Sequence, residues 1–321
     1  MKKILILTEP VDRHAHAVAA ALRLKGAEPV LWQTPDFPSR SGESILFEAD
    51  RGRITVRGPE TDFGGDEWAS VWHRRPSFCL AGSPLHPADR EFADLECNVF
   101  RRSLLGVLAP DAFWVNPADA MTRAGRKPVQ HRAALAAGLR MPDTLYSNDP
   151  AEIRAFLRRH GGRIVYKPFR GQAWRNEETW WTPYTSLRTE DDLVADDLLR
   201  TTPGIFQELV PKAYELRVTV MGRHALAAKI LSQETENGRL DWRKSYGELR
   251  MEPFDLPRRL AERCVDLLER LGLVFGCFDF IVPPGGDPVF LEVNEMGQFL
   301  FIERYADIPL LDTFSELLLQ G

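Results

Sequence analysis

Apolar and polar residues alternate in some stretches of the chain and recur every three to four positions in others, which predicts strands and helices respectively. An apolar run at 3–8 predicts a strand, a helical pattern at 13–25 ends before Gly26, and a second strand is expected at 29–32. The order strand, helix, strand predicts an α/β amino-terminal domain. No G-x-G-x-x-G sequence follows the first strand, which argues against a dinucleotide site there.

The amino-terminal part continues with a predicted hairpin at 45–56 and a long predicted helix at 86–105. The helix has apolar residues at Phe92, Leu95, Val99 and Leu104, a spacing that predicts one buried face. We place a domain boundary after this region, at the strand that begins near Trp114.

A chain of 321 residues suggests two or three domains, and we divide it into three. The first is an α/β domain at 1–113, the second is a central domain at 114–203, and the third is a carboxy-terminal domain at 204–321. Within the central domain, an acidic helix is predicted from Thr189 to Leu199, with Thr189 as its cap.

A predicted hairpin at 275–294 carries polar side chains on both strands. With a period of two, Asp279 lies on one face of the first strand, and Glu292 and Asn294 share a face of the second with Phe290. Carboxylate and amide oxygens suit Mg2+, whose remaining ligands are usually water and nucleotide phosphates. The alternative is a surface hairpin with acids on its wet face, which the apolar flanks disfavour.

Arg217 lies in another predicted strand, where its side chain shares a face with Glu215 and Thr219. Three polar groups on one side of an apolar strand indicate a site, and an arginine there can bind a phosphoryl group or a carboxylate by two contacts. The alternative is a surface ladder of Glu and Arg. Lys229, in the next predicted strand, is a further candidate for binding phosphate.

Composition narrows the class of protein. The 321 residues include 41 basic and 46 acidic side chains, for a net charge of −5, and no long basic run occurs, so nucleic acid is not an expected partner. The four cysteines are far apart, which predicts reduced thiols in a cytoplasmic protein. The first apolar run is too short for a signal peptide, and we expect no membrane span.

Four features follow one another in a definite order. Lys127, in a predicted helix, precedes Lys167 at the end of a predicted strand; the strand 207–210 then leads to Arg217; the oxygen-rich hairpin comes last. Together they resemble the ATP-grasp superfamily over nearly the whole chain. The resemblance implies an α/β (α+β) fold of three domains, with the nucleotide bound between two α+β domains behind the α/β amino-terminal domain.

The same resemblance implies residues for binding ATP. Lys127 and Lys167 are expected at the phosphates, whose roughly four negative charges two lysines and a metal ion can partly neutralise. Glu215 is expected at the ribose, and Val165 and Ile281 on either side of adenine. The linker expected to bind adenine through its backbone consists of Gln207, Glu208, Leu209 and Val210. Solvated lysines remain the alternative for Lys127 and Lys167.

Three local sequences narrow the resemblance to one branch: Ser232-Gln233 followed by Asp241-Trp242-Arg243, the stretch 206–220, and the stretch 292–303. They resemble the maturases of graspetides, the microviridin-type peptides. The segment 171–181 is not glycine-rich, whereas RimK-like ligases usually carry a Gly/Ser-rich loop there. These ligases are the nearest alternative.

Members of this family join Asp or Glu side chains of a ribosomal precursor peptide to Thr or Ser hydroxyls or to Lys amines. The resemblance implies an ATP- and Mg2+-dependent ligase in which the carboxylate becomes an acyl phosphate before the hydroxyl or amine attacks. Positioning and charge stabilisation suffice for such chemistry. Arg217 is expected at the transferring phosphoryl group and Arg243 at the acceptor carboxylate, with an ion pair to Asp241 as the alternative for Arg243.

The implied partners are the leader and core of the precursor peptide and a second copy of the chain in a homodimer. The acidic stretch at 189–197 is a candidate contact for a basic leader, with an ordinary solvated face as the alternative. A RimK-like ligase that adds amino acids to a carboxylate, and an ATP-binding module without catalysis, both stay open.

Overall fold

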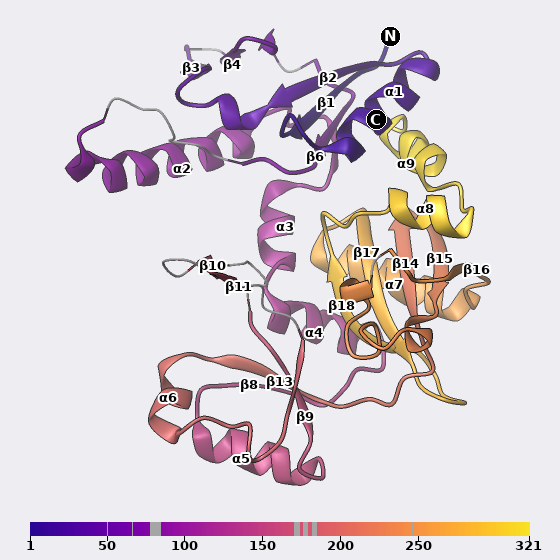
Figure 1. Cartoon of the computed structure of the whole chain (residues 1–321). Helices are drawn as coiled ribbons and strands as arrows, with labels where there is room; N and C mark the ends of the chain where they lie inside the picture. The colour runs from indigo at the N-terminus through magenta and orange to yellow at the C-terminus, as the bar shows by residue number, and fades with distance from the viewer. Residues whose placement is uncertain are drawn as a thin grey trace.

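The protein is represented by a computed structural model that describes residues 1–49, 51–65, 67–77, 85–169, 174–175, 179–181, 185–245 and 247–321. Figure 1 shows the amino-terminal layer at the top, the central unit below it and the carboxy-terminal sheet beside them. The last helix returns to the amino-terminal layer. The mixture of helices and sheets confirms the α+β fold class.

The amino-terminal domain is built on a parallel sheet of order β2-β1-β6-β7. Its strands are β1 (Lys3–Thr8), β2 (Glu28–Gln33), β6 (Ser70–His73) and β7 (Phe113–Val115). Helices α1 (Arg13–Leu24) and α9 (Leu310–Leu318) pack on one face, and α2 (Arg90–Val107) packs on the other. Coverage of both faces explains why β1 is apolar without alternation.

The predicted hairpin forms β3 (Gly42–Phe47) and β4 (Gly52–Arg57), which β5 (Asp62–Gly64) extends into a three-stranded sheet. Short 3-10 helices occupy Thr34–Asp36 and Pro87–Asp89.

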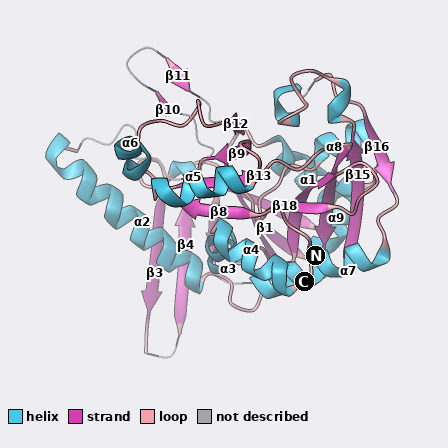
Figure 2. Cartoon of the chain, turned by 90° about the horizontal axis from the view of Figure 1, so that it is seen from below, coloured by secondary structure: helices cyan, strands magenta, loops and turns pink. Residues whose placement is uncertain are grey.

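The predicted buried face of α2 is wrong over its first half. Phe92, Leu95 and Val99 are all more than half exposed, whereas Leu104 and Leu105 are buried. The physical reason is that only the carboxy-terminal turns of α2 pack on the sheet, while its other end reaches outward (Figures 1 and 2).

The central unit is an antiparallel sheet of order β12-β9-β13-β8. Its strands are β8 (Thr144–Ser147), β9 (Ile164–Lys167), β12 (Ser186–Arg188) and β13 (Gly204–Glu208). Helices α5 (Pro150–Arg159) and α6 (Asp196–Thr201) pack together, and Figure 2 shows α5 along β8. Because β13 pairs with both β8 and β9, this sheet extends beyond the boundary expected at 203.

The helix predicted from Thr189 to Leu199 is wrong. The helix there is the short α6, which begins at Asp196. Both the amide and the hydroxyl of Thr189 donate to Asp192 Oδ2, at 2.9 and 2.7 Å, and this local turn replaces the first helical turns. Two short strands, β10 (Trp174–Arg175) and β11 (Trp180–Trp181), pair with each other, whereas 171–173 and 176–178 lie outside the described residues.

The carboxy-terminal unit is an antiparallel sheet of order β16-β15-β14-β17-β18. Its strands are β14 (Tyr214–Met221), β15 (His224–Ile230), β16 (Met251–Phe254), β17 (Phe275–Val282) and β18 (Val289–Asn294). The helices nearby are α3 (Ala118–Ala124), α4 (Lys127–Ala136), α7 (Arg258–Leu271) and α8 (Leu300–Ala306), with 3-10 turns at Ser232–Glu234 and Trp242–Ser245. Helices α4 and α7 share a buried core with one face of this sheet, which leaves the other face for the site.

One detail of the predicted hairpin is wrong. Asp279 pairs with Glu292 but Phe280 pairs with Phe290, so Leu291 is an extra residue in β18. This β-bulge breaks the alternation. It turns Phe290 into the core, on the opposite side from Glu292.

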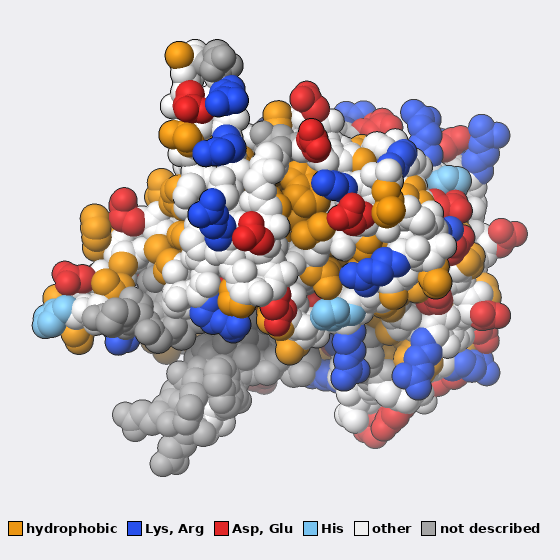
Figure 3. Space-filling model, turned by 90° about the horizontal axis from the view of Figure 1, so that it is seen from above, with side chains coloured by type: hydrophobic (Ala, Val, Ile, Leu, Met, Phe, Trp, Pro, Cys, Tyr) orange, Lys and Arg blue, Asp and Glu red, His pale blue; other side chains and the backbone are white. Residues whose placement is uncertain are grey.

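Cys97, Cys264 and Cys277 are free thiols, and Cys79 lies outside the described residues. None of the described helices has the length and apolarity needed to cross a membrane. On the face seen from above, acidic and basic side chains are interspersed, as the nearly balanced composition predicts (Figure 3).

Candidate active site

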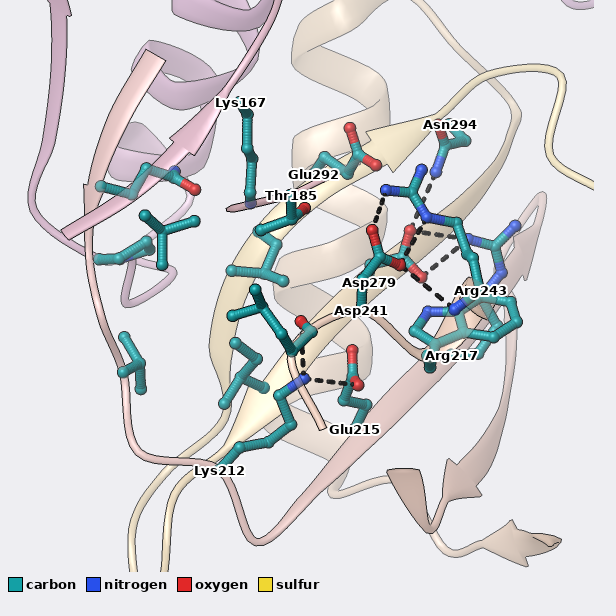
Figure 4. A pocket seen from close by; sticks show the side chains of 18 of the residues that line it. Lys167, Thr185, Lys212, Glu215, Arg217, Asp241, Arg243, Asp279, Glu292 and Asn294 are labelled. Atoms are coloured by element: carbon teal, nitrogen blue, oxygen red, sulfur yellow. Dashed lines mark hydrogen bonds and ion pairs between the residues drawn. The ribbon is translucent and has the colours of Figure 1, made fainter. Parts of the chain in front are cut away.

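A cavity of about 730 Å3 lies between the central sheet and the carboxy-terminal sheet. Every site residue predicted from the sequence except Lys229 lines it. The central sheet contributes Val165 and Lys167 from β9, and the carboxy-terminal sheet contributes its open face. Figure 4 shows that the labelled acidic and basic side chains converge on one space.

The predicted metal ligands are brought together by β17 and β18. Asp279 and Glu292 are directly paired across the two strands, and Asn294 Nδ2 donates to Asp279 Oδ2 at 3.0 Å. Among the described residues, no three His, Cys, Asp or Glu side chains are grouped so that they could hold a metal ion by themselves. The oxygen donors fit a hard cation such as Mg2+ that takes its other ligands from water and phosphate.

Each carboxylate of this pair also has a basic partner. Arg217 Nη1 donates to both carboxylate oxygens of Asp279 at 2.8 Å, and Lys127 forms an ion pair with Glu292. Burial acts to raise the pKa of Glu292, but Lys127, followed by Lys167 and Arg243, outweighs it and lowers the pKa to about 2. Glu292 is therefore ionised throughout the physiological range.

The pKa of Asp279 shifts in the opposite direction from that of Glu292. Burial raises it, Arg217 opposes the rise, and the neighbouring charge of Glu292 adds to it. Two carboxylates this close favour a cation between or beside them, because each destabilises the ionised form of the other.

Lys167 ends β9 and points into the cavity (Figure 4). It has no ion-pair partner among the described residues, and burial lowers the pKa of its ammonium group. Lys127 enters from the first turn of α4. Two lysines from different elements therefore face the same space as Glu292, an arrangement that suits a polyanionic ligand.

The predicted linker runs from the end of β13 along the cavity wall. Gln207 Nε2 donates to Thr144 Oγ1 at 3.0 Å, which fixes one end of the linker. Val165 and Ile281 supply apolar walls, as expected. Leu291, which the β-bulge places in the wall, adds a third apolar side chain.

Sequence reasoning missed Lys212. Its ammonium group lies 2.8 Å from Glu215 Oε1, and both side chains are buried. Burial raises the pKa of Glu215, and Lys212 acts against this rise. The available signal was its position directly after the predicted linker, at Pro211-Lys212.

Arg243 lines the cavity and forms a two-point ion pair with Asp241, with distances of 2.8 and 2.6 Å. The ion pair considered as an alternative is therefore present. The Arg243 side chain is nevertheless 53% exposed, so part of its surface still faces the cavity. Asp241 thus orients an arginine at the edge of the cavity.

The assignment of Lys229 to the nucleotide site is wrong. Lys229 pairs with Leu216, which lies on the core face of the sheet, whereas Arg217 pairs with Ala228 on the cavity face. Its ammonium group lies 4.6 Å from the centre of the Tyr214 ring. The alternation of side chains along β15 therefore points Lys229 away from the cavity.

Two further cavity residues were also missed. Arg75 comes from the segment after β6, and Glu295 follows Asn294 in the loop after β18. Arg75 belongs to a different domain from the remainder of the cavity, so no local pattern connects it with the site.

The cleft lies between two antiparallel sheets that carry helices. Two lysines, an acidic pair and an adjoining arginine line it, and together these features define an ATP-grasp ligase. No family model matches the sequence, and no curated protein sequence matches it, whereas solved structures match it over its full length. Macrocyclase MdnB from Microcystis aeruginosa MRC is 30% identical, with a TM-score of 0.84 and coverage of 100% of both chains.

Two other structures extend the comparison. A RiPP-associated ATP-grasp ligase from Chryseobacterium gregarium, solved with ADP and a leader and core peptide, is 27% identical, with a TM-score of 0.90 and coverage of 100% of this chain and 97% of that one. Macrocyclase MdnC from Microcystis aeruginosa MRC, bound to precursor peptide MdnA, is 27% identical, with a TM-score of 0.85 and coverage of 99% and 100%. The chain belongs to the ATP-grasp family of graspetide maturases.

Proposed function

We propose that this protein uses ATP and Mg2+ to macrocyclise a ribosomally made precursor peptide, by joining Asp or Glu side chains to Thr or Ser hydroxyls or to Lys amines. The observation that carries the proposal is the convergence of Asp279, Glu292, Lys127 and Lys167 on one cavity. The peptide-bound complexes of the similar ligases support the substrate class.

Ring formation proceeds in two steps. A substrate carboxylate oxygen attacks the γ-phosphorus of ATP, ADP leaves, and an acyl phosphate forms. A hydroxyl or amine then attacks the acyl carbon, phosphate leaves, and the nucleophile loses its proton. The net result is one ring and the loss of one water from the peptide.

The residues of the chain position and neutralise the reactants. Lys127 and Lys167 hold the phosphates, Glu215 with Lys212 holds the ribose, and the linker 207–210 holds adenine between apolar walls. Asp279, Glu292 and Asn294 would hold the Mg2+, which supplies charge neutralisation and polarisation of phosphate oxygens. The lysines and the metal ligands act on the phosphate charge that moves during phosphoryl transfer, whereas the contacts to ribose and adenine position the nucleotide.

Arg217 and Arg243 act on the peptide side of the reaction. Arg217 is already oriented by Asp279, and we assign it to the transferring phosphoryl group or the acyl phosphate. Arg243 is oriented by Asp241, and we assign it to the acceptor carboxylate. Two-point contacts from arginine suit both ligands.

We propose further that the chain has three domains, with the first at 1–113 and with the boundary expected at 203 moved past β13, which belongs to the central sheet. We also propose that the reaction takes place in the cytoplasm and that the protein is a homodimer. The exposed apolar residues Phe92, Leu95 and Val99 on α2 support self-association. Light scattering of the purified protein measures its mass and contradicts the dimer if it finds one chain.

Mass spectrometry of a precursor peptide encoded beside the gene, incubated with protein, ATP and Mg2+, tests the function. We expect successive losses of 18 Da, one for each ring, and their disappearance with Glu292→Gln. A gain of amino-acid mass would instead indicate a RimK-like ligase. ATP binding without any change in the peptide, tested over a panel of precursors, would indicate a non-catalytic module.

A further inference from the structure

The amino-terminal domain reaches the cavity through two adjacent arginines after β6. Arg74 is 1% exposed, its Nε donates to Asp12 Oδ2 at 2.9 Å, and its Nη1 donates to the Met296 carbonyl at 2.5 Å. Asp12 in turn caps α1 through its other carboxylate oxygen. Arg74 therefore ties the amino-terminal domain to the loop that follows Asn294.

A second contact holds the same loop. The amides of Phe299 and Leu300 both donate to His14 Nε2, at 3.1 and 3.2 Å. Burial, followed by the charge of Arg74, lowers the pKa of His14 to about 4, so the imidazole is neutral and accepts these bonds at physiological pH. The amino-terminal domain thus fixes the loop 296–300 at two points.

This loop also touches the phosphoryl end of the cavity. The Gln298 carbonyl accepts from Arg217 Nη2 at 3.2 Å, and Arg217 is the partner of Asp279. Met296, Gly297 and Gln298 all line the cavity. The wall formed by the amino-terminal domain therefore adjoins the centre where the phosphoryl group is transferred.

Arg75 is the next residue after the buried Arg74. Arg74 points into the domain contact, and Arg75, which is half-buried, lines the cavity. Arg75 lines the same cavity as Met296, Gly297 and Gln298 of this loop. Its charge also contributes to lowering the pKa of both His14 and Arg74, for which burial is the main cause.

Arg75 differs from most other cations of the cavity because it has no acidic partner. Lys127, Lys212, Arg217 and Arg243 each form an ion pair with a carboxylate, whereas no ion pair or side-chain hydrogen bond of Arg75 occurs among the described residues. A half-buried guanidinium without a counterion is suited to an oxyanion supplied by a ligand.

We propose that Arg75 binds the carboxylate of the substrate side chain that is to be activated, and that Arg74 and Asp12 position it. The inference rests on the proposed function and adds to Arg243 a second arginine that contacts the acceptor carboxylate, from the amino-terminal domain. The oxyanion could come from the peptide or from the nucleotide. The peptide is favoured because lysines and metal ligands already face the phosphates, while Arg75 enters from a different domain beside Gln298.

Steady-state kinetics and peptide binding with Arg75→Met, Arg75→Lys and the control Arg53→Met test this assignment. Arg53 is exposed on β4, away from the cavity. We expect Arg75→Met to lower kcat/KM for the peptide about 10- to 100-fold, the usual effect of losing a hydrogen bond to a charged group, without changing the KM for ATP or Tm. We expect Arg75→Lys to restore part of the loss and Arg53→Met to have no effect.

Binding to a second peptide locates the contact. A precursor whose core Asp and Glu residues are replaced by Asn and Gln should bind Arg75→Met and the unsubstituted protein equally, whereas the acidic precursor should distinguish them. An unchanged kcat/KM would overturn the assignment, and a raised KM for ATP with unchanged peptide binding would move Arg75 to a phosphate. If the unsubstituted protein forms no rings, the proposed function fails instead.

Discussion

Two glutamates of this protein each form a short ion pair with one basic residue, yet their pKa values move in opposite directions. Glu43 pairs with Arg101 in the amino-terminal domain, and both side chains are 0% exposed. Burial raises the pKa of Glu43 to about 7, although Arg101 opposes the rise. In the cavity, Glu292 pairs with Lys127 and its pKa is lowered to about 2.

The difference lies in the number of neighbouring cations and in access to solvent. Glu292 has Lys127, Lys167 and Arg243 around it and is 31% exposed. Among the described residues, the cation that lowers the pKa of Glu43 is Arg101, which stacks on the Trp32 and Phe37 rings. A buried ion pair therefore does not by itself indicate a site. An excess of positive charge at an open cavity does indicate a site, because an anionic ligand is needed to balance it.

The largest effect on activity is expected from removing one of the positive charges of the cavity. Lys167→Met should lower kcat/KM for ATP by about 10²- to 10³-fold, the usual result of deleting one preorganised charge that stabilises a transition state. Tm should stay the same or rise, because the partly buried ammonium has no partner to lose. Steady-state kinetics and thermal unfolding measure both quantities.

A fall in Tm together with preserved kinetics would contradict this expectation and would make Lys167 a structural residue like Arg101. Arg53→Met again serves as the control for the loss of a surface charge.

Much of the cavity could be predicted because its residues lie in short, strongly patterned strands. Alternation alone brought Asp279 and Glu292 to one face, and the structure confirms that they are neighbours. The same rule failed for Phe290, since one extra residue, Leu291, shifts the register. Alternation could not decide whether Lys229 faces the cavity, because the face of Lys229 depends on which residue of β14 lies opposite to it.

Contacts between distant parts of the chain could not be predicted from the pattern of apolar and polar residues. Arg75 reaches the cavity only because Arg74 docks the amino-terminal domain on the loop after β18, more than two hundred positions along the chain. The face of α2 failed for a related reason, since its apolar spacing is helical but half of the helix has no sheet beneath it. Periodicity predicts a helix or strand without specifying its neighbour.

A change of intermediate size is expected at Glu43. Because its pKa is about 7 in the folded protein and near 4.5 when unfolded, folding favours its protonated form. This contribution is complete below pH 4.5 and is lost as pH rises through 7, a difference of about 3 kcal/mol. Glu43→Gln should not show this loss. The free energy of unfolding of the variant, minus that of the unsubstituted protein, should therefore increase between pH 4.5 and 8.

Urea unfolding of both proteins at several pH values measures this difference. His14 and His73, whose pKa values burial lowers to about 4, change stability in the opposite direction below pH 6.5. They are present in both proteins and cancel in the comparison. A constant difference across the range would show that Arg101 keeps Glu43 ionised, as the cations of the cavity do for Glu292.

The smallest effect is expected at Lys229, one strand away from Arg217 but on the other face of the sheet. Lys229→Ala removes only the contact of the ammonium group with the Tyr214 ring, worth about 0.5–1 kcal/mol of stability. Kinetic constants for ATP and peptide should not change. A tenfold rise in the KM for ATP would return Lys229 to the nucleotide site, and would require that the pairing of β14 with β15 differ by one residue, since only such a shift exchanges the two faces.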